Sequence, residues 1–335
     1  MTIDMHTHFV PAPMADALRE RREPPWIEAM PDGTERIHLP IEHLAFGPQY
    51  MDMDARIEFM DARGVDRQLL SFPGLFGLDS LPADECLPLL KLFNDETAAV
   101  CRAHPDRFSG LAALPFADID AAVAELERGC TELGLAGAIL PNNAFVSVAE
   151  AEKLRPVFEA ASRLKVHLFI HPGRRPDEVP PPGTGPKGSP FPDLVFARQA
   201  LGVQAAVAQT TATLLFSDVL DDFPDATVHV ANLGGTLPMV IERMEHVAET
   251  RDVPGDRPMK RARDSRLHVD CSSLGARALE IAVAIFGADR IVVGTDCPIF
   301  STDWTLAAIR DADLSDADRR AILHENAERL LGGTG

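Results

Sequence analysis

Residues 1–10 read MTIDMHTHFV, and this short apolar run ends in two histidines that lie two positions apart. Residues i and i+2 of a β-strand point to the same side, so His6 and His8 can converge on one point. The pattern predicts a first strand over residues 2–6 with a pair of candidate metal ligands at its end. Because an H-x-H pair often occurs by chance, its meaning depends on the elements around it.

Seven further short runs resemble residues 2–6 in length, apolar character and content of β-branched side chains. Continuous apolar runs of this length are typical of strands that are buried on both faces. Helical patterns separate the runs, and several of these patterns stop at a glycine or before a proline. The seven runs lie at residues 67–72, 108–114, 136–140, 166–170, 227–231, 266–270 and 290–294.

Eight strands that alternate with helices predict an α/β fold with a parallel sheet, closed into a distorted (β/α)8 barrel of the TIM type. The length of 335 residues suits one such barrel, so we expect a single domain over residues 1–335. Residues 9–51 follow the first strand and are rich in proline, and we interpret them as a long, irregular insertion or lid. Residues 172–192 follow the fifth strand and are expected to form an active-site loop, because barrel active sites lie at the C-terminal ends of the strands.

The formal net charge of −19 argues against a nucleic-acid binder, which needs a basic face, and against adhesion to an anionic membrane. No apolar run reaches the length of about 18 residues that a membrane span requires, and the first residues lack the pattern of a signal peptide. The five cysteines are odd in number and include no C-x-x-C pair, which indicates reduced thiols. We therefore expect a cytoplasmic protein that binds neither nucleic acid nor membrane.

Two further strand ends carry residues that can bind a metal. His171 ends the fifth run, in LFIHPG, and Asp296 follows the eighth, in VVGTDCP. In a barrel these two residues face the same mouth as His6 and His8, although each of them alone could instead be a capped strand end or a helix cap. Three imidazoles and one carboxylate suit a borderline cation such as Zn²⁺ and leave a coordination position for water. The sequence therefore predicts one divalent metal at this mouth.

The stretches IDMHTHFVP, HLFIHPG, NLGGTLPMVIERM, IVVGTDCP and ILHENAERLL together resemble the amidohydrolase superfamily. Within it, the chain is most similar to the branch that contains aminocarboxymuconate-semialdehyde decarboxylase and the resorcylate-type decarboxylases. The resemblance covers essentially the whole chain, and it implies the barrel fold and a homodimer. It also implies that a single zinc ion, or manganese in some members, is bound by the residues matching His6, His8, His171 and Asp296.

Three arginines are candidates for holding a substrate carboxylate, which an arginine fork can bind through two parallel N–H groups. In the semialdehyde decarboxylase, the residue matching Arg56 holds this carboxylate, and the residue matching Arg243 reaches it across the dimer interface. Arg174 lies in the loop after His171, where it can contribute to a basic patch over the metal. Each of the three arginines could instead be a solvated or interface charge.

One position departs from the family pattern, in which a histidine precedes a pair of glycines after the sixth strand. Here the residues are VANLGG, so Asn232 stands in place of that histidine. An asparagine side chain can donate and accept hydrogen bonds but cannot gain or lose a proton near neutral pH. By strand parity His229 should point to the opposite face from Asn232, and we expect His229 and His268 to pack against strands or to lie outside the barrel.

Three interpretations fit this site. In the first, Asp296 is both metal ligand and proton shuttle, Asn232 orients the substrate, and the enzyme is a lyase. It would then decarboxylate a small aromatic or muconate-like carboxylic acid without oxidation. In the second, Asp296 activates a metal-bound hydroxide that hydrolyses an amide, a lactone or a C–C bond. In the third, the site binds metal and ligand but turns over poorly. The first is preferred, with a small-molecule carboxylate as the expected partner.

Overall fold

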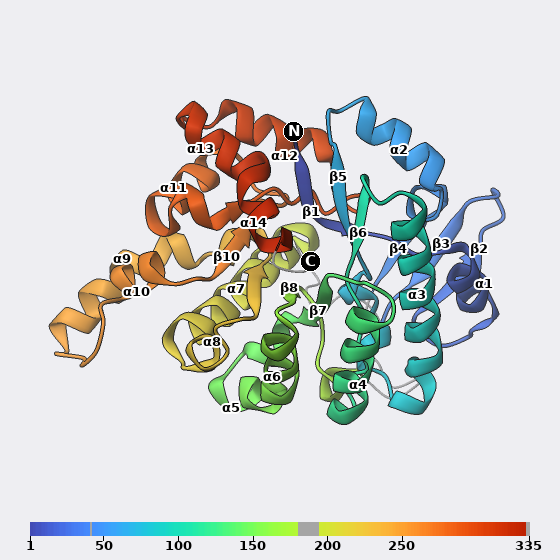
Figure 1. The fold of residues 1–335 in the computed structure, drawn as a ribbon, viewed down its shortest axis with the longest axis horizontal. Helices are drawn as coiled ribbons and strands as arrows, with labels where there is room; N and C mark the ends of the chain where they lie inside the picture. Colours follow the sequence, from blue (N-terminus) through green and yellow to red (C-terminus); the bar gives the residue numbers. More distant parts are fainter. Residues whose placement is uncertain (41, 180–193, 333–335) are drawn as a thin grey trace.

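The computed structural model describes residues 1–40, 42–179 and 194–332, and Figure 1 shows most of its strands near the centre, with helices around them. Within these residues, eight parallel strands form two sheets. In the first sheet the order is β1 (Ile3–His8), β5 (Arg67–Ser71) and β6 (Phe108–Gly110). In the second sheet the neighbours, in sequence order, are β7 (Gly137–Pro141), β8 (His167–His171), β9 (Thr227–Val230), β10 (His268–Asp270) and β11 (Ile291–Val292).

Three isolated parallel bridges join these sheets at both of their edges, and one of them pairs Thr7 of β1 with Cys297. Ala112 pairs with Ala138 beyond the end of β6, and Asp4 of β1 pairs with Val293 just after β11. The strands therefore close into a ring, and the predicted (β/α)8 barrel is confirmed. The barrel is distorted at β1, where the pairing register with β5 shifts between Asp4 and Thr7.

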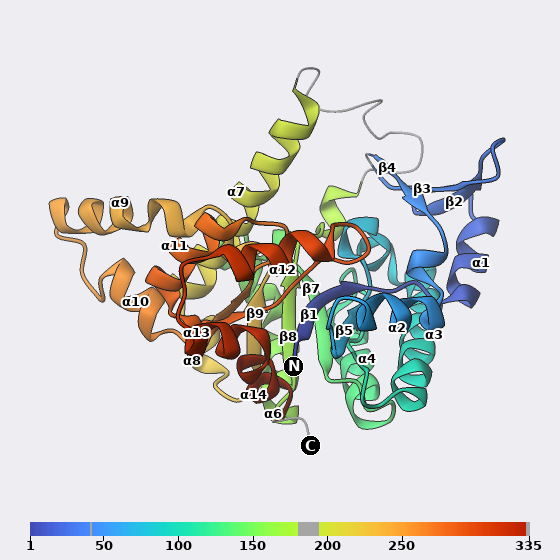
Figure 2. The same ribbon diagram turned by 90° about the horizontal axis from the view of Figure 1, so that it is seen from above.

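The helices pack around the outside of the strands, as Figures 1 and 2 show from two directions. The longer ones are α2 (Met53–Asp61), α3 (Ala83–Ala103), α4 (Ile119–Thr131), α6 (Arg155–Leu164), α7 (Val195–Phe216), α9 (Leu237–Thr250), α11 (Ala276–Phe286) and α12 (Thr302–Asp311). The shorter ones are α5 (Val148–Ala151), α8 (Val219–Asp222), α10 (Pro258–Asp264), α13 (Asp316–Arg320) and α14 (Asn326–Gly332). Within the described residues, no helix combines the length and the apolar character needed to cross a membrane.

Residues 9–51 are more regular than their proline-rich sequence predicts. They contain α1 (Ala12–Glu20) and an antiparallel sheet of β2 (Trp26–Ala29), β3 (Glu35–His38) and β4 (His43–Phe46). Ile27 and Ile37 of this sheet are buried in one cluster with barrel residues such as Phe72 and Phe76. The expected irregular insertion is therefore a small folded layer, because burial of its apolar side chains outweighs the preference of prolines for irregular backbone. Figure 2 shows this layer at the same end of the barrel as the first turns of α7.

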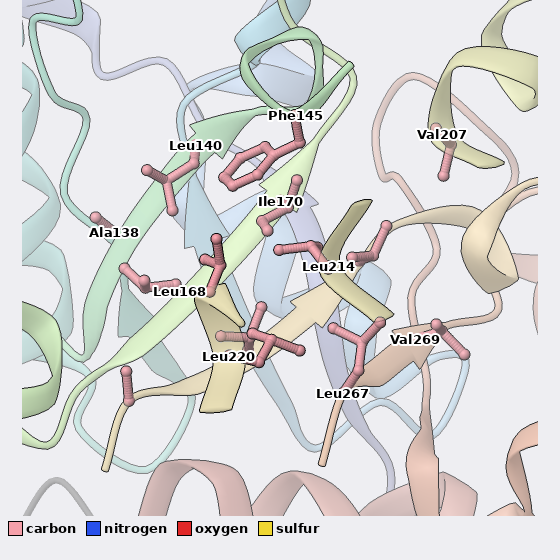
Figure 3. Close-up of a cluster of buried hydrophobic side chains, with 14 of the residues drawn as sticks. Ala138, Leu140, Phe145, Leu168, Ile170, Val207, Leu214, Leu220, Leu267 and Val269 are labelled. Atoms are coloured by element: carbon pink, nitrogen blue, oxygen red, sulfur yellow. The ribbon is translucent and has the colours of Figure 1, made fainter. Parts of the chain in front are cut away.

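Successive side chains of β8 point alternately into the barrel interior and into the layer between the strands and the helices. Leu168 and Ile170 point outward into the apolar cluster drawn in Figure 3, which also contains Leu214 of α7. Phe169 and His171 point to the other side, into the barrel, where both are buried. The period of two along the strand thus places a histidine of β8 in the barrel interior.

Gly137 begins β7 with a φ of +152°, and a β-carbon there would lie 1.7 Å from the carbonyl oxygen of His167 on β8. We expect Gly137→Ala to lower the free energy of unfolding by about 3 kcal/mol or more, because the two paired strands must move apart. Gly134→Ala is the control, since φ is also positive there but a β-carbon would meet no described atom within 4 Å. Its expected cost is about 1 kcal/mol. Urea denaturation measures both variants, and equal losses would contradict this account.

Candidate metal centre

His6, His8, His171 and Asp296 come together in space although they lie at three separate places in the sequence. The two N-terminal histidines belong to β1, His171 ends β8, and Asp296 follows β11. One ligand atom from each residue lies within 4.8 Å of the others, and all four residues are buried. The Oδ1 atom of Asp296 is 3.0 Å from Nε2 of His8 and 3.6 Å from Nε2 of His6. The structure thus gathers at one point the residues that the sequence singled out.

Backbone contacts between β1 and the segment after β11 bring Asp296 to the histidines. The N–H of Asp296 donates to the carbonyl of His6 (2.8 Å), and the N–H of His8 donates to the carbonyl of Cys297 (2.7 Å). Asp296 itself has a φ of +58°, in the left-handed region that a residue other than glycine seldom adopts. Such backbone persists where the surrounding structure imposes it, and it clusters at functional sites. Closure of the barrel therefore positions this carboxylate.

Two of the four ligand atoms of this cluster lack the partners that buried polar atoms normally have. Within the described part of the chain, Nε2 of His6 and Oδ1 of Asp296 are buried and have no hydrogen-bond partner. The Nε2 atoms of His8 and His171 face each other at 3.2 Å. Unsatisfied atoms of this kind are costly to bury, and a cation between them would satisfy them. Three imidazole nitrogens and one carboxylate oxygen therefore fit a single divalent metal ion.

Asp270, at the end of β10, contacts His6 through the ring nitrogen that faces away from the cluster. Its Oδ2 atom lies 2.9 Å from Nδ1 of His6, and both side chains are fully buried. Its Oδ1 atom accepts hydrogen bonds from the backbone N–H groups of Asn232 (3.1 Å) and Ser272 (2.9 Å). A carboxylate on the far nitrogen of a metal-binding histidine fixes the proton there and leaves the other nitrogen free for the metal. Asp270 was not among the predicted site residues, although its place at the end of a strand is the signal that identified His171.

Arg56, one of the predicted substrate ligands, lies behind β1 and is only 4% exposed. Its Nη2 atom donates to the carbonyls of His8 (2.6 Å) and Gln49 (3.1 Å), and its Nη1 atom donates to Oε1 of Gln68 (3.2 Å). These bonds make the guanidinium a support for the backbone that carries His8. Binding of a substrate carboxylate by Arg56 stays a prediction.

Arg174 lies three residues beyond His171, at the start of the expected active-site loop. Its backbone is anchored because the hydroxyl of Ser80 donates to the Arg174 carbonyl (2.6 Å). Its side chain makes no ion pair with any residue that the structure describes, and its Nε atom is buried without a partner. Burial lowers the pKa of Arg174. This cation is therefore available to an anion, while residues 180–192 of the same loop lie outside the described residues.

The backbone leaves the extended conformation at Asn232, two residues after the end of β9, where Asn232 and Leu233 have φ values of +59° and +54°. The Oδ1 atom of Asn232 is buried and finds no partner among the described residues. Because the strand ends here, the parity argument that placed His229 on the outer face is wrong. His229 lies in the barrel interior, stacked on Phe169 with ring centroids 4.1 Å apart, and its register partner His268 is also buried.

Arg243 lies away from the cluster, on the exposed side of α9. It lines a cavity of about 770 Å³ together with Phe216 and Val240, and the described lining of this cavity includes none of the four candidate metal ligands. Within one chain the structure does not bring Arg243 to the cluster. Its predicted action across a dimer interface stays a prediction.

Burial and neighbouring charges set the protonation of the cluster. Burial lowers the pKa of His6, but the charges of Asp270 and Asp296 outweigh it and raise this pKa to about 9. Burial, followed by the charge of His6, lowers the pKa of His8 well below its usual value, and burial with the charge of His8 does the same to the pKa of His171. Burial also raises the pKa of Asp296. In the metal-free protein at neutral pH, His6 therefore carries a proton that a metal must displace.

The sequence profile of the family described as Amidohydrolase matches residues 3–333. The chain belongs to this family. Gamma-resorcylate decarboxylase of Rhizobium sp. (strain MTP-10005) is 29% identical over 302 residues, which cover 83% of this chain and 86% of that protein. 2-Amino-3-carboxymuconate-6-semialdehyde decarboxylase of Dictyostelium discoideum is 27% identical over 345 residues, which cover 99% of this chain and 92% of that protein. The resemblance inferred from the sequence motifs is confirmed.

Solved structures of related proteins share the fold. The 5-carboxyvanillate decarboxylase from Sphingomonas paucimobilis has a TM-score of 0.76 at 21% identity, covering 99% of this chain and 98% of that chain. A dihydroxybenzoic acid decarboxylase from Polaromonas sp. JS666, determined with bound manganese and the inhibitor 2-nitroresorcinol, has a TM-score of 0.70 at 21% identity. This match covers 99% of this chain and 96% of that chain. At this level of identity the likeness shows a common fold.

We expect the affinity for a divalent metal to rise about tenfold for each pH unit between about pH 6 and pH 8. The reason is that His6, whose pKa is about 9 in the metal-free protein, must lose one proton over this whole range. Asp270→Asn removes the largest of the charges that raise this pKa, so its pH dependence should be shallower. Chelator-competition titrations at several pH values measure both slopes. A pH-independent affinity of the unaltered protein would contradict the assigned protonation.

Proposed function

We propose that the chain is a metal-dependent lyase that removes a carboxyl group from a small aromatic or muconate-like acid as CO2, without oxidation. The observation that carries this proposal is the buried cluster of His6, His8, His171 and Asp296, whose ligand atoms lie within 4.8 Å of one another. The names of the relatives support decarboxylation among the reactions that such a centre can catalyse.

A divalent ion held by these four residues would polarise a substrate oxygen and fix its position. Asp296 has a second task in this proposal, in which its carboxyl group would carry the proton that the reaction needs. When the bond between the substrate carbon and its carboxylate breaks, the electron pair stays on that carbon. The proton of Asp296 forms the new C–H bond, CO2 leaves, and Asp296 regains a proton from solvent.

We assign orientation of the substrate to Asn232. Its Oδ1 atom is buried and unpartnered within the described residues, while Asp270 holds its backbone N–H at 3.1 Å. The backbone of Asn232 is therefore held in place, while the oxygen of its side-chain amide is open to a hydrogen bond. Because an amide cannot titrate near neutral pH, proton transfer is left to Asp296.

Arg174 is the arginine that the geometry favours for the substrate carboxylate. It follows the metal candidate His171 by three residues and makes no ion pair within 4 Å in the described part of a chain whose net charge is −19, although the charges of Glu178 and Glu42 act on it. A free, partly buried guanidinium can offer two parallel N–H groups to a carboxylate with little competition from water. Arg56 already serves the backbone of His8 in this arrangement, and Arg243 would act only from a neighbouring subunit.

We propose zinc as the metal, because imidazole nitrogens dominate the set of donors. Manganese is the alternative, since it is the ion bound in the solved Polaromonas decarboxylase. Elemental analysis of protein purified without added metal distinguishes the two ions.

The remaining proposals concern assembly and location. We propose a homodimer, on the family resemblance, and one domain over residues 1–335 in which residues 9–51 form a lid and residues 172–192 an active-site loop. A cytoplasmic location is proposed because all five cysteines are free thiols, which suits a reducing compartment.

Product analysis tests the reaction. Protein loaded with zinc or manganese is incubated with a panel of aromatic and muconate-like acids in water enriched in ¹⁸O. The expected outcome is release of CO2 and an organic product that lacks one carboxyl group and contains no oxygen from the solvent. Incorporation of ¹⁸O into the organic product without CO2 would identify a hydrolase instead. Absence of both reactions with metal bound would refute an active enzyme for these acids.

Asp296→Asn is the variant for the same assay, because it keeps the size of the side chain but removes the transferable proton. We expect turnover to fall at least about 100-fold, the range typical of a lost acid–base group, while the fold is retained. Asp303→Asn changes an exposed carboxylate nearby in the sequence and should leave turnover unchanged. Circular dichroism and metal content accompany the rates, and full activity of the Asp296 variant would exclude the assigned role.

Arg174→Met should raise the KM for a carboxylate substrate by about tenfold or more, because a charge-assisted hydrogen bond is lost. Arg174→Lys keeps the charge without the fork and should recover part of the effect. Lys153→Met removes an exposed cation and is the control. Steady-state kinetics with one acid measures all three variants, and an unchanged KM in the methionine variant would show that Arg174 does not contact the substrate.

A further inference from the structure

A row of polar side chains, called the polar row below, runs through the barrel interior from Thr227 to the metal centre. Oγ1 of Thr227 lies 2.8 Å from Nδ1 of His167, and Nε2 of His167 lies 2.6 Å from Nδ1 of His229. Nε2 of His229 lies 3.7 Å from Oδ2 of Asp270, the oxygen that is 2.9 Å from Nδ1 of His6. Apart from Thr227, every residue of the polar row is fully buried.

Flat ring contacts hold the two imidazoles in place. The rings of His167 and His229 lie nearly in one plane, edge to edge, with centroids 4.8 Å apart and 11° between their planes. His229 stacks on Phe169, at 4.1 Å and 6°. Phe169 in turn meets the ring of His6 edge to face, with centroids 4.7 Å apart. These contacts leave the imidazoles little freedom to rotate, so their nitrogens keep fixed directions.

The carboxylate at one end sets the direction of the hydrogen bonds. Burial lowers the pKa of His167 to about 3 and the pKa of His229 well below its usual value, so each imidazole is neutral and carries one N–H. Asp270 as a carboxylate can only accept, so the proton of His229 belongs on Nε2 and its Nδ1 accepts from Nε2 of His167. Nδ1 of His167 then accepts from the hydroxyl of Thr227. Every hydrogen-bond donor in the polar row therefore points toward Asp270.

We propose that His229, supported by His167, is a positioning residue for the metal ligand His6. Its Nε2–H holds the carboxylate of Asp270 in the orientation that receives the Nδ1–H of His6, which keeps Nε2 of His6 directed at the metal. At 3.7 Å this contact is an ion–dipole interaction rather than a hydrogen bond, and Nε2 of His229 has no other partner in the described chain. The inference rests on the proposed metal function, but the direction of the hydrogen bonds can be tested without metal.

Space filling alone does not account for this arrangement. Apolar side chains such as Phe169 already fill the barrel interior, and polar rings are costly to bury unless their nitrogens find partners. Outer partners of a metal-binding histidine typically change metal affinity by about 10- to 100-fold. An effect of this size on metal affinity distinguishes positioning from packing.

His229→Phe keeps a flat ring that can stack on Phe169 and removes both nitrogens. We expect it to weaken metal binding by about 10- to 100-fold, and His229→Gln, whose amide N–H can point at Asp270, to recover part of the loss. His268→Phe is the matched control and should bind metal like the unaltered protein. His268 is the register partner of His229 on β10 and is also buried. Its Nδ1 atom, however, contacts the carbonyl of Arg266 (3.0 Å) and makes no hydrogen bond to the polar row.

Chelator competition with Zn²⁺ measures the dissociation constants, and circular dichroism checks that each variant is folded. In the metal-free protein labelled with ¹⁵N-histidine, NMR should find the proton of both His167 and His229 on Nε2. Unchanged affinity in a folded His229→Phe variant, or a proton on Nδ1 of His229, would overturn the inference. If that variant does not fold, the NMR assignment decides. Failure of the unaltered protein to bind any metal would overturn the proposed function instead. The NMR result would still decide the direction of the hydrogen bonds in the polar row.

Discussion

The structure depends on the backbone hydrogen bonds that close β1 against the segment after β11. They join residues 289 or 290 positions apart, with Asp296 donating to the carbonyl of His6 and His8 donating to the carbonyl of Cys297. Closure removes the free edges of the two sheets and places the carboxylate beside the histidines in the same step. The geometry of the site is therefore a property of the closed barrel, because no single strand carries all four ligand residues.

The polar groups of the barrel interior fall into two layers with opposite character. In the outer layer, buried carboxylates are well satisfied: Asp270 contacts His6 and two backbone N–H groups, and Asp4 accepts from the hydroxyl (2.6 Å) and the backbone N–H (3.0 Å) of Thr295. In the inner layer, the ligand atoms of His6 and Asp296 have no partner in the described chain. A satisfied layer around an unsatisfied one is the arrangement expected of a preformed cation site, because only the inner atoms are left for the ion.

The arginines show that residue type alone does not decide a role. Arg56 and Arg174 both lie close in sequence or space to metal candidates, yet the guanidinium of Arg56 is bonded to backbone carbonyls, whereas Arg174 has no ion pair among the described residues. In a chain with a net charge of −19, a cation without a carboxylate partner is a specific attraction for an anionic substrate. The same surplus of acid elsewhere gives such a substrate little reason to bind at other surfaces.

The sequence by itself determined the eight strands and the four clustered residues, because both depend on local patterns. Strands buried on two faces read as short apolar runs, and His6, His8, His171 and Asp296 stand at or just after the ends of such runs. Only the tertiary structure decided the order of residues 9–51, whose sheet is stabilised by apolar side chains from the barrel. It also decided the roles of Asp270, His229 and His167, since their partners lie on other strands, up to 264 positions away. A sequence shows which residues end a strand, but contacts across the barrel arise from the pairing and closure of all its strands.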